Sequence, residues 1–113
     1  MMLEWNEYQK QLGAAIGEMA KLSPDTVRGY GQLSGAGAKT AHLDAKTREL
    51  IALAVAVTRQ CDGCITFHSD AAAKNGATRE EVMEALGVAI TVNAGAALVY
   101  SARAMDAFAA KGS

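Results

Sequence analysis

The sequence has little of what builds sheets, disulfide frameworks or charged binding surfaces. Its 113 residues include one proline and two cysteines, and aromatic residues make up only 5%. The formal net charge is −1 and there is no basic cluster, which argues against nucleic acid and anionic membranes as partners. No signal peptide is visible, and no stretch reaches the roughly 20 uninterrupted apolar residues of a spanning helix. These absences favour a single cytoplasmic domain over residues 1–113.

Apolar residues instead recur at helical spacing, which predicts an all-α, single-domain helical bundle of about six helices. An amphipathic first helix spans 5–22, and Ser23-Pro24 ends it and starts a second. The glycines of segment 34–37 predict that this second helix is short. A third helix opens at Asp44, its N-cap, and should be the central, most buried one. Its expected inward residues are Leu50, Ile51, Leu53, Ala54 and Val57.

The C-terminal half predicts three more helices. A fourth runs from about Asp62 to Lys74, and the capping-box pattern at Thr78 starts a fifth. Segment 93–95 is expected to break or kink the chain before a last helix. The expected inward residues of the fifth helix are Val82, Leu86, Ala89 and Ile90, and the apolar residues of the last are Leu98, Val99, Ala102, Met105 and Phe108.

The segment from Cys61 to His68 carries the chemistry that the sequence predicts. Cys64 follows Cys61 by three positions, and His68 follows Cys64 by four, so a helix would place His68 one turn beyond Cys64 on the same face. A helix N-terminus favours a thiolate over a thiol because its unpaired N–H groups and dipole are positive. The pattern therefore predicts redox or nucleophilic sulfur chemistry.

Glu49 is the expected partner of His68. If segment 60–63 is the turn of an antiparallel hairpin, His68 lies about 12 Å from the bend and Glu49 lies about 16 Å from it on the preceding helix. The two levels differ by less than one helical pitch, which both side chains can bridge. The hairpin could thus align a nucleophile, a base and a group that orients the base.

The spacing Glu49-(eleven residues)-Cys61-x-x-Cys64-x-x-x-His68 resembles the core motif of the alkylhydroperoxidase AhpD-like branch of the carboxymuconolactone decarboxylase family. Segments 47–56 and 75–82 resemble the flanks of that motif. The resemblance covers about residues 24–108. It implies an all-helical fold that assembles into homotrimers or homohexamers.

The resemblance also implies a thiol-dependent peroxidase of the alkyl hydroperoxide reductase type, without metal, haem or other cofactor. In that activity Cys64 attacks the hydroperoxide substrate and becomes a sulfenic acid, and Cys61 condenses with it to a disulfide. A dithiol reductant, such as a thioredoxin-like or lipoyl protein, then reduces the pair. His68 and Glu49 would relay protons.

One departure from the family pattern lies between the cysteines. AhpD proper carries a histidine directly before the second cysteine and is a longer chain, whereas this sequence has Gly63 at that position. The proton network could therefore be reduced, and peroxidase turnover weaker or differently directed.

Other interpretations of the motif stay open at this stage. The pair could serve a dithiol–disulfide oxidoreductase acting on a protein or lipoyl partner, or a non-catalytic redox-sensing oligomer. Carboxymuconolactone decarboxylation is less expected, because that branch does not use this cysteine pair. A zinc site from Cys61, Cys64, His68 and His42 lacks a second ligand pair at finger-like spacing, and His42 reads most simply as a surface loop residue. The residues do not decide which cysteine attacks.

Overall fold

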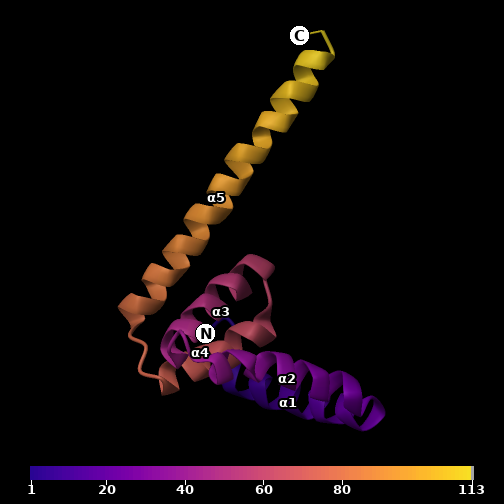
Figure 1. Cartoon of the computed structure of the whole chain (residues 1–113), viewed down its shortest axis with the longest axis vertical. Helices are drawn as coiled ribbons and strands as arrows, with labels where there is room; N and C mark the ends of the chain where they lie inside the picture. The colour runs from indigo at the N-terminus through magenta and orange to yellow at the C-terminus, as the bar shows by residue number, and fades with distance from the viewer. Residues whose placement is uncertain (113) are drawn as a thin grey trace.

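The computed structural model describes residues 1–112, and these form five α-helices without a strand (Figure 1). The helices are α1 (Trp5–Leu22), α2 (Pro24–Thr40), α3 (Ala45–Arg59), α4 (Asp62–Lys74) and α5 (Arg79–Ala110). The predicted all-α class is confirmed. The expected number of about six helices is wrong by one, because the last two expected helices are a single element.

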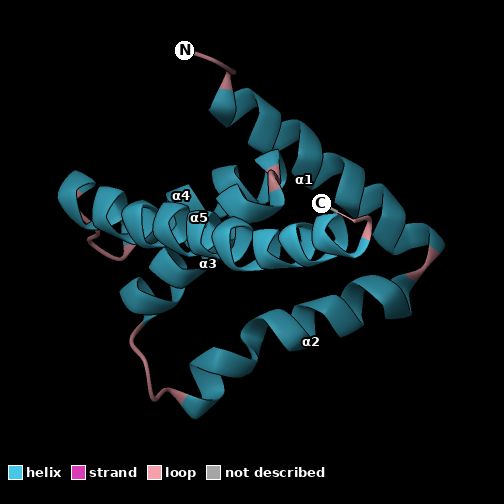
Figure 2. Cartoon of the chain, turned by 90° about the horizontal axis from the view of Figure 1, so that it is seen from above, coloured by secondary structure: helices cyan, strands magenta, loops and turns pink. Residues whose placement is uncertain are grey.

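Helix α3 lies at the centre, in contact with both α4 and α5, as the sequence predicts. Helix α1 packs on α4, and α2 packs on α1, from which it diverges beyond their junction in Figure 2. Among residues 1–112 the buried apolar ones are few and mostly small: Leu53, Ala56, Ala72 and Ala89. Alanines at the contacts let the helix axes approach closely, so the core is thin and sits between α3, α4 and α5.

Side-chain oxygen caps fix where α3 and α5 begin. The Asp44 carboxylate accepts a hydrogen bond from the Thr47 backbone N–H (2.8 Å) at the start of α3. Thr78 and Glu81 form the predicted capping box at the start of α5. The hydroxyl of Ser23 makes no such cap on α2 and contacts the Thr26 hydroxyl instead (2.7 Å). Local cap signals therefore set α3 and α5, whereas Pro24 alone marks the start of α2.

The expectation that α2 is short is wrong, since it continues through the glycines to Thr40. Each glycine costs a helix only about 1 kcal/mol relative to alanine, and Ala36 and Ala38 alternate with the glycines here. Gly37 also has a packing role, because a Cβ there would lie 2.9 Å from Cδ of Arg48. The missing side chain lets Arg48 cross the end of α2.

The break expected at 93–95 is also wrong, because α5 runs unbroken over 32 residues. The Asn93 side chain donates to the Ala89 carbonyl (2.7 Å) and to the Thr58 hydroxyl (2.8 Å), so it ties α5 to the end of α3 without disturbing the helix backbone. Alanines flanking Gly95 favour continuation of the helix.

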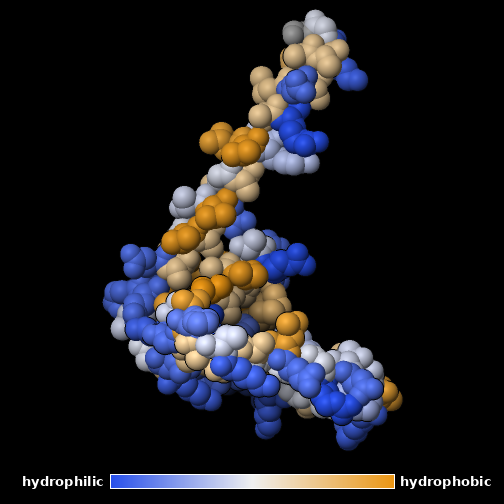
Figure 3. Space-filling model, viewed as in Figure 1, coloured by the Kyte–Doolittle hydropathy of each residue, from blue (hydrophilic) through white to orange (hydrophobic). Residues whose placement is uncertain are grey.

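The C-terminal half of α5 projects away from the other helices (Figure 1). The radius of gyration is 18.6 Å, against about 13 Å for a compact chain of this length. Hydrophobic residues line the projecting helix in Figure 3, and large exposed examples are Val92, Leu98, Val99, Tyr100, Met105 and Phe108. Two residues expected to face inward, Ile51 and Ile90, are also more than half exposed. They lie on faces of α3 and α5 that no other helix of the chain covers.

By length and composition alone, α5 is apolar enough to cross a membrane, with a mean hydropathy of 1.7 over its most apolar window. The sequence of α5 contains no uninterrupted apolar run of that length, because Thr91 and Asn93 lie within it. Helices that form the core of a soluble protein meet the same criterion, and only 6% of this window is buried within the chain. Most of the apolar surface of α5 is therefore exposed within the chain.

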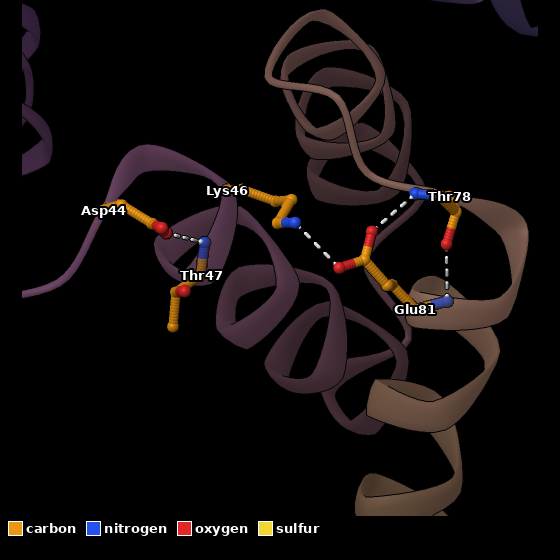
Figure 4. Close-up of polar contacts among 5 residues, drawn as sticks. All are labelled: Asp44, Lys46, Thr47, Thr78 and Glu81. Atoms are coloured by element: carbon orange, nitrogen blue, oxygen red, sulfur yellow. Dashed lines mark hydrogen bonds and ion pairs between the residues drawn. The ribbon is translucent and has the colours of Figure 1, made fainter.

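An ion pair joins α3 to the start of α5 (Figure 4). Lys46 Nζ lies 2.7 Å from Glu81 Oε2, and the two side chains are 34% and 36% exposed. The hydrogen bond from Lys46, followed by that from the Thr78 backbone, lowers the pKa of Glu81 below its ordinary 4.5. The same bond raises the pKa of Lys46 above its ordinary 10.5.

The pair should make stability depend on pH at both ends of the scale. Glu81, whose pKa is lowered on folding, contributes stability that is complete above its ordinary pKa and is lost as pH falls through the lowered value. Lys46 contributes stability that is complete below its ordinary pKa and is lost as pH rises through the raised value.

Glu81→Gln keeps the capping box but removes the charge, so we expect a shallower fall of the melting temperature between about pH 5 and pH 3. Thermal melts followed by circular dichroism measure this, with the exposed neighbour Glu80→Gln as control. Equal acid slopes in the two variants would contradict the expectation.

Candidate functional site

The turn between α3 and α4 places the cysteines at the start of α4. Gln60 ends α3 in the left-handed conformation (φ 53°), and the Cys61 N–H donates back to the Ala56 carbonyl (3.1 Å). This pattern closes a helix and turns the chain sharply, here with glutamine where glycine is more usual. The next helix therefore begins immediately, with Cys61 as its N-cap.

Cys61 and Cys64 are joined by a disulfide, with their Cα atoms 5.3 Å apart. The Cys64 backbone N–H donates to Cys61 Sγ (3.2 Å), so the sulfur occupies the place that a serine or aspartate oxygen takes in other N-caps. Both residues are partly buried. After reduction, a thiolate here would face the positive end of the α4 dipole.

Glu49 and His68 form the contact that the hairpin geometry predicts. Nδ1 of His68 on α4 lies 2.6 Å from Oε2 of Glu49 on α3, and the side chains are 31% and 23% exposed. A carboxylate at this position accepts a hydrogen bond from Nδ1–H, which leaves Nε2 as the ring atom available for proton exchange. The pair is a short, partly shielded hydrogen bond that orients the imidazole.

The structure thus brings the four predicted residues together as two pairs. His68 lies one turn beyond Cys64 on the same helix, and Glu49 reaches it from α3. No hydrogen bond joins His68 to either sulfur among residues 1–112.

Helix α1 makes contacts with α4 that the sequence analysis does not predict. The buried Thr66 hydroxyl, in a residue 4% exposed, lies 3.2 Å from both the Trp5 carbonyl and the Gln9 side-chain oxygen. Gln9 in turn donates to Asp70 (3.2 Å), and this bond, followed by that from Lys74, lowers the pKa of Asp70. The sequence carries no signal for these contacts, since Gln9 and Thr66 are separated by 57 positions.

The zinc interpretation finds no matching geometry. Within residues 1–112, no three histidine, cysteine or acidic side chains gather in an arrangement that could hold a metal. His42 is exposed in the loop between α2 and α3, as expected of a surface residue.

These features define the class of the protein: an all-helical chain with a Cys-x-x-Cys disulfide at the start of a helix and a His–Glu pair beside it. The profile of the carboxymuconolactone decarboxylase family matches residues 24–107. The chain belongs to this family. The match leaves α1 outside and includes all four predicted site residues.

Relatives and a solved structure agree with this assignment. An uncharacterized protein from Haemophilus influenzae is 46% identical over 108 residues, which cover 96% of each chain. Uncharacterized protein 4 in the cox locus of Paracoccus denitrificans is 38% identical over 92 residues, covering 81% of this chain and 83% of that one. The crystal structure of an apo carboxymuconolactone decarboxylase family protein from Legionella pneumophila is 41% identical. It superposes with a TM-score of 0.75 over 93% of this chain and 94% of that one.

Proposed function

We propose that the protein is a thiol-dependent peroxidase that reduces hydroperoxides through the Cys61–Cys64 pair. The observation that carries the proposal is the disulfide at the start of α4 next to the short Glu49–His68 hydrogen bond. The pair provides two redox states, and the helix start favours the thiolate of the reduced state. An oriented imidazole nearby provides a proton carrier.

The proposed cycle has two steps on the protein. The Cys64 thiol gives its proton to His68, and the thiolate attacks one oxygen of the hydroperoxide; an S–O bond forms and the O–O bond breaks. The departing alkoxide takes a proton from His68 and leaves as an alcohol. The Cys61 thiol then attacks the Cys64 sulfenic acid, so that the disulfide forms and the hydroxyl group leaves as water with the Cys61 proton.

Glu49 acts on the imidazole and not on the substrate. Its carboxylate fixes the ring so that Nε2 exchanges the proton, and its negative charge stabilises the protonated ring between the two transfers. This is the same division of labour by which a buried carboxylate supports a histidine in other nucleophilic sites. Glu49 is therefore a positioning residue, and His68 is the proton carrier.

An external dithiol closes the cycle by reducing the disulfide, and we propose a thioredoxin-like or lipoyl protein in that role. A cytoplasmic location would keep such reductants available. The exposed apolar residues of α5 support assembly into a homotrimer or homohexamer, because a free monomer would leave them in water. Active sites would then lie close to subunit contacts.

The test is peroxide consumption by the purified protein with a small dithiol such as dithiothreitol or dihydrolipoamide. We expect consumption of cumene hydroperoxide that scales with protein concentration, with one disulfide formed per peroxide when a reduced sample reacts without added dithiol. Reduction of a disulfide substrate without any peroxide turnover would instead favour the oxidoreductase interpretation. No reaction with either substrate, together with a change in the mass of the assembly on oxidation, would favour the redox-sensing oligomer.

A further inference from the structure

Helix α1 packs beside the cysteine turn although it lies outside the part of the chain that matches the family profile. The profile begins at residue 24, whereas α1 spans Trp5–Leu22 and contacts α4, the helix that carries both sulfurs. The position of α1 on α4 therefore brings to the site side chains from outside the matched residues 24–107.

Helix α1 approaches the turn closely at Leu12 and Gly63. A Cβ atom added to Gly63 would lie 2.6 Å from Cδ2 of Leu12, which is well inside the contact distance of two carbon atoms. Gly63 sits between Cys61 and Cys64 in the sequence, in the first turn of α4. The Leu12 methyl group thus rests on the backbone between the two sulfur-bearing residues, in the space that any side chain at position 63 would take.

Polar contacts hold α1 in this position. The Thr66 hydroxyl contacts the Trp5 carbonyl and the Gln9 side chain, and Gln9 donates to Asp70. Leu12 lies one turn beyond Gln9 on the same face of α1 and is partly buried. Because Gln9 is anchored on both sides, the backbone of α1 holds Leu12 against the turn at Gly63.

We propose that Leu12 is a specificity-determining residue for the Cys61–Cys64 pair. Its side chain covers the turn at Gly63 and restricts the approach of bulky reagents to the sulfurs, so that the pair reacts preferentially with small or slender partners. The peroxide consequence of this inference rests on the proposed function. The accessibility of the reduced thiols does not, and it is measured separately.

Thiol accessibility is tested by alkylating the reduced full-length protein with a small reagent, iodoacetamide, and a bulky one, fluorescein maleimide, and following each cysteine by mass spectrometry. Leu12→Ala should raise the rate with the bulky reagent several-fold and change the rate with iodoacetamide little. Leu22→Ala is the matched control, because Leu22 lies on the same helix and is 88% exposed. An unchanged ratio of the two rates in Leu12→Ala would overturn the proposal.

Gly63→Ala provides a second variant that does not depend on truncating Leu12. The new methyl group must displace the Leu12 side chain, whose tip is flexible, so this variant should also raise the bulky-to-small ratio of alkylation rates. In the double variant Leu12→Ala/Gly63→Ala the two effects should not add, since both act through one contact. Additive effects on the ratio would mean that Leu12 does not cover the turn, and would overturn the proposal.

A comparison of two peroxides then tests whether the Leu12 side chain also determines which peroxide reacts. If the protein is a peroxidase, Leu12→Ala should raise the rate with cumene hydroperoxide relative to hydrogen peroxide several-fold, in step with the alkylation ratio. A change in alkylation without any peroxide turnover in the wild type would refute the proposed function and leave the role of Leu12 intact. Peroxide turnover in the wild type, with an alkylation ratio that Leu12→Ala leaves unchanged, would support the proposed function and refute the role of Leu12.

Discussion

Replacing Cys64 by serine is expected to reduce peroxide consumption to the uncatalysed background. A serine hydroxyl is almost fully protonated at neutral pH and does not form an analogue of the sulfenic acid, so neither step of the proposed cycle proceeds. Serine is close to cysteine in size at this partly buried position, so the fold should be retained. Consumption of cumene hydroperoxide in the presence of dithiothreitol, with circular dichroism to verify folding, measures the effect.

Cys61→Ser is the matched variant, since it removes the other sulfur and leaves a residue that is itself a preferred helix N-cap. It should allow a single turnover and stop at the Cys64 sulfenic acid, which dimedone traps as a defined increase in mass. A sulfenic acid trapped on Cys61 in the Cys64→Ser variant, with no turnover in Cys61→Ser, would show that the roles are exchanged. The contact of Cys61 Sγ with the Cys64 N–H makes this a sharp test, because the N-cap position also favours a thiolate.

The parts of the structure that were predictable from the sequence are those fixed by neighbouring residues. The caps at Asp44 and Thr78 are satisfied within one turn, so a short pattern is enough to place them. The Glu49–His68 contact was predictable for a related reason. A tight turn at 60–63 leaves an antiparallel hairpin little freedom, and the rise per residue then sets which side chains meet.

The lengths of α2 and α5 were not predictable from the same local signals. Glycine and asparagine weaken a helix by amounts that a few flanking alanines or one tertiary contact offset. Asn93 shows this, since its side chain bonds to Thr58 on another helix while the backbone stays helical. Glycine or asparagine in a segment indicates a local free-energy cost to the helix. Whether the helix continues through it depends also on contacts with residues distant in sequence.

The contribution of α1 to the site was beyond prediction for the same reason. Gln9 and Asp70 are separated by 61 positions, and nothing in either segment indicates that the other is its partner. In the sequence, Gly63 is only a departure from the family pattern. The structure adds the physical reason, because the Leu12 side chain occupies the space that a side chain at position 63 would need. The sequence therefore indicated the cysteines, the histidine and the glutamate of the candidate site, and did not indicate the α1 side chains that pack beside them.

Glu49→Gln is expected to lower kcat/KM for hydroperoxide by about 10²-fold, at the lower end of what positioned acid–base groups contribute. Glutamine is nearly the same size and can still accept a hydrogen bond from Nδ1, but it has no charge to stabilise the protonated imidazole. In the proposed mechanism the Cys64 thiolate and the protonated ring form together, so this pair of charges loses a stabilising partner. Iodoacetamide should accordingly alkylate Cys64 more slowly at neutral pH, in the same reduced sample used for the kinetics.

Two comparisons distinguish this role from a structural one. Glu84→Gln, the same change at an exposed position of α5, should leave both the kinetics and the alkylation rate unchanged. Adding Glu49→Gln to His68→Asn should cost little beyond His68→Asn alone, because the carboxylate acts through the ring. If Glu49→Gln slowed peroxide turnover as much in the absence of His68 as in its presence, the carboxylate would act on the sulfur or substrate directly. The short hydrogen bond between α3 and α4 would then be a structural tie between two helices.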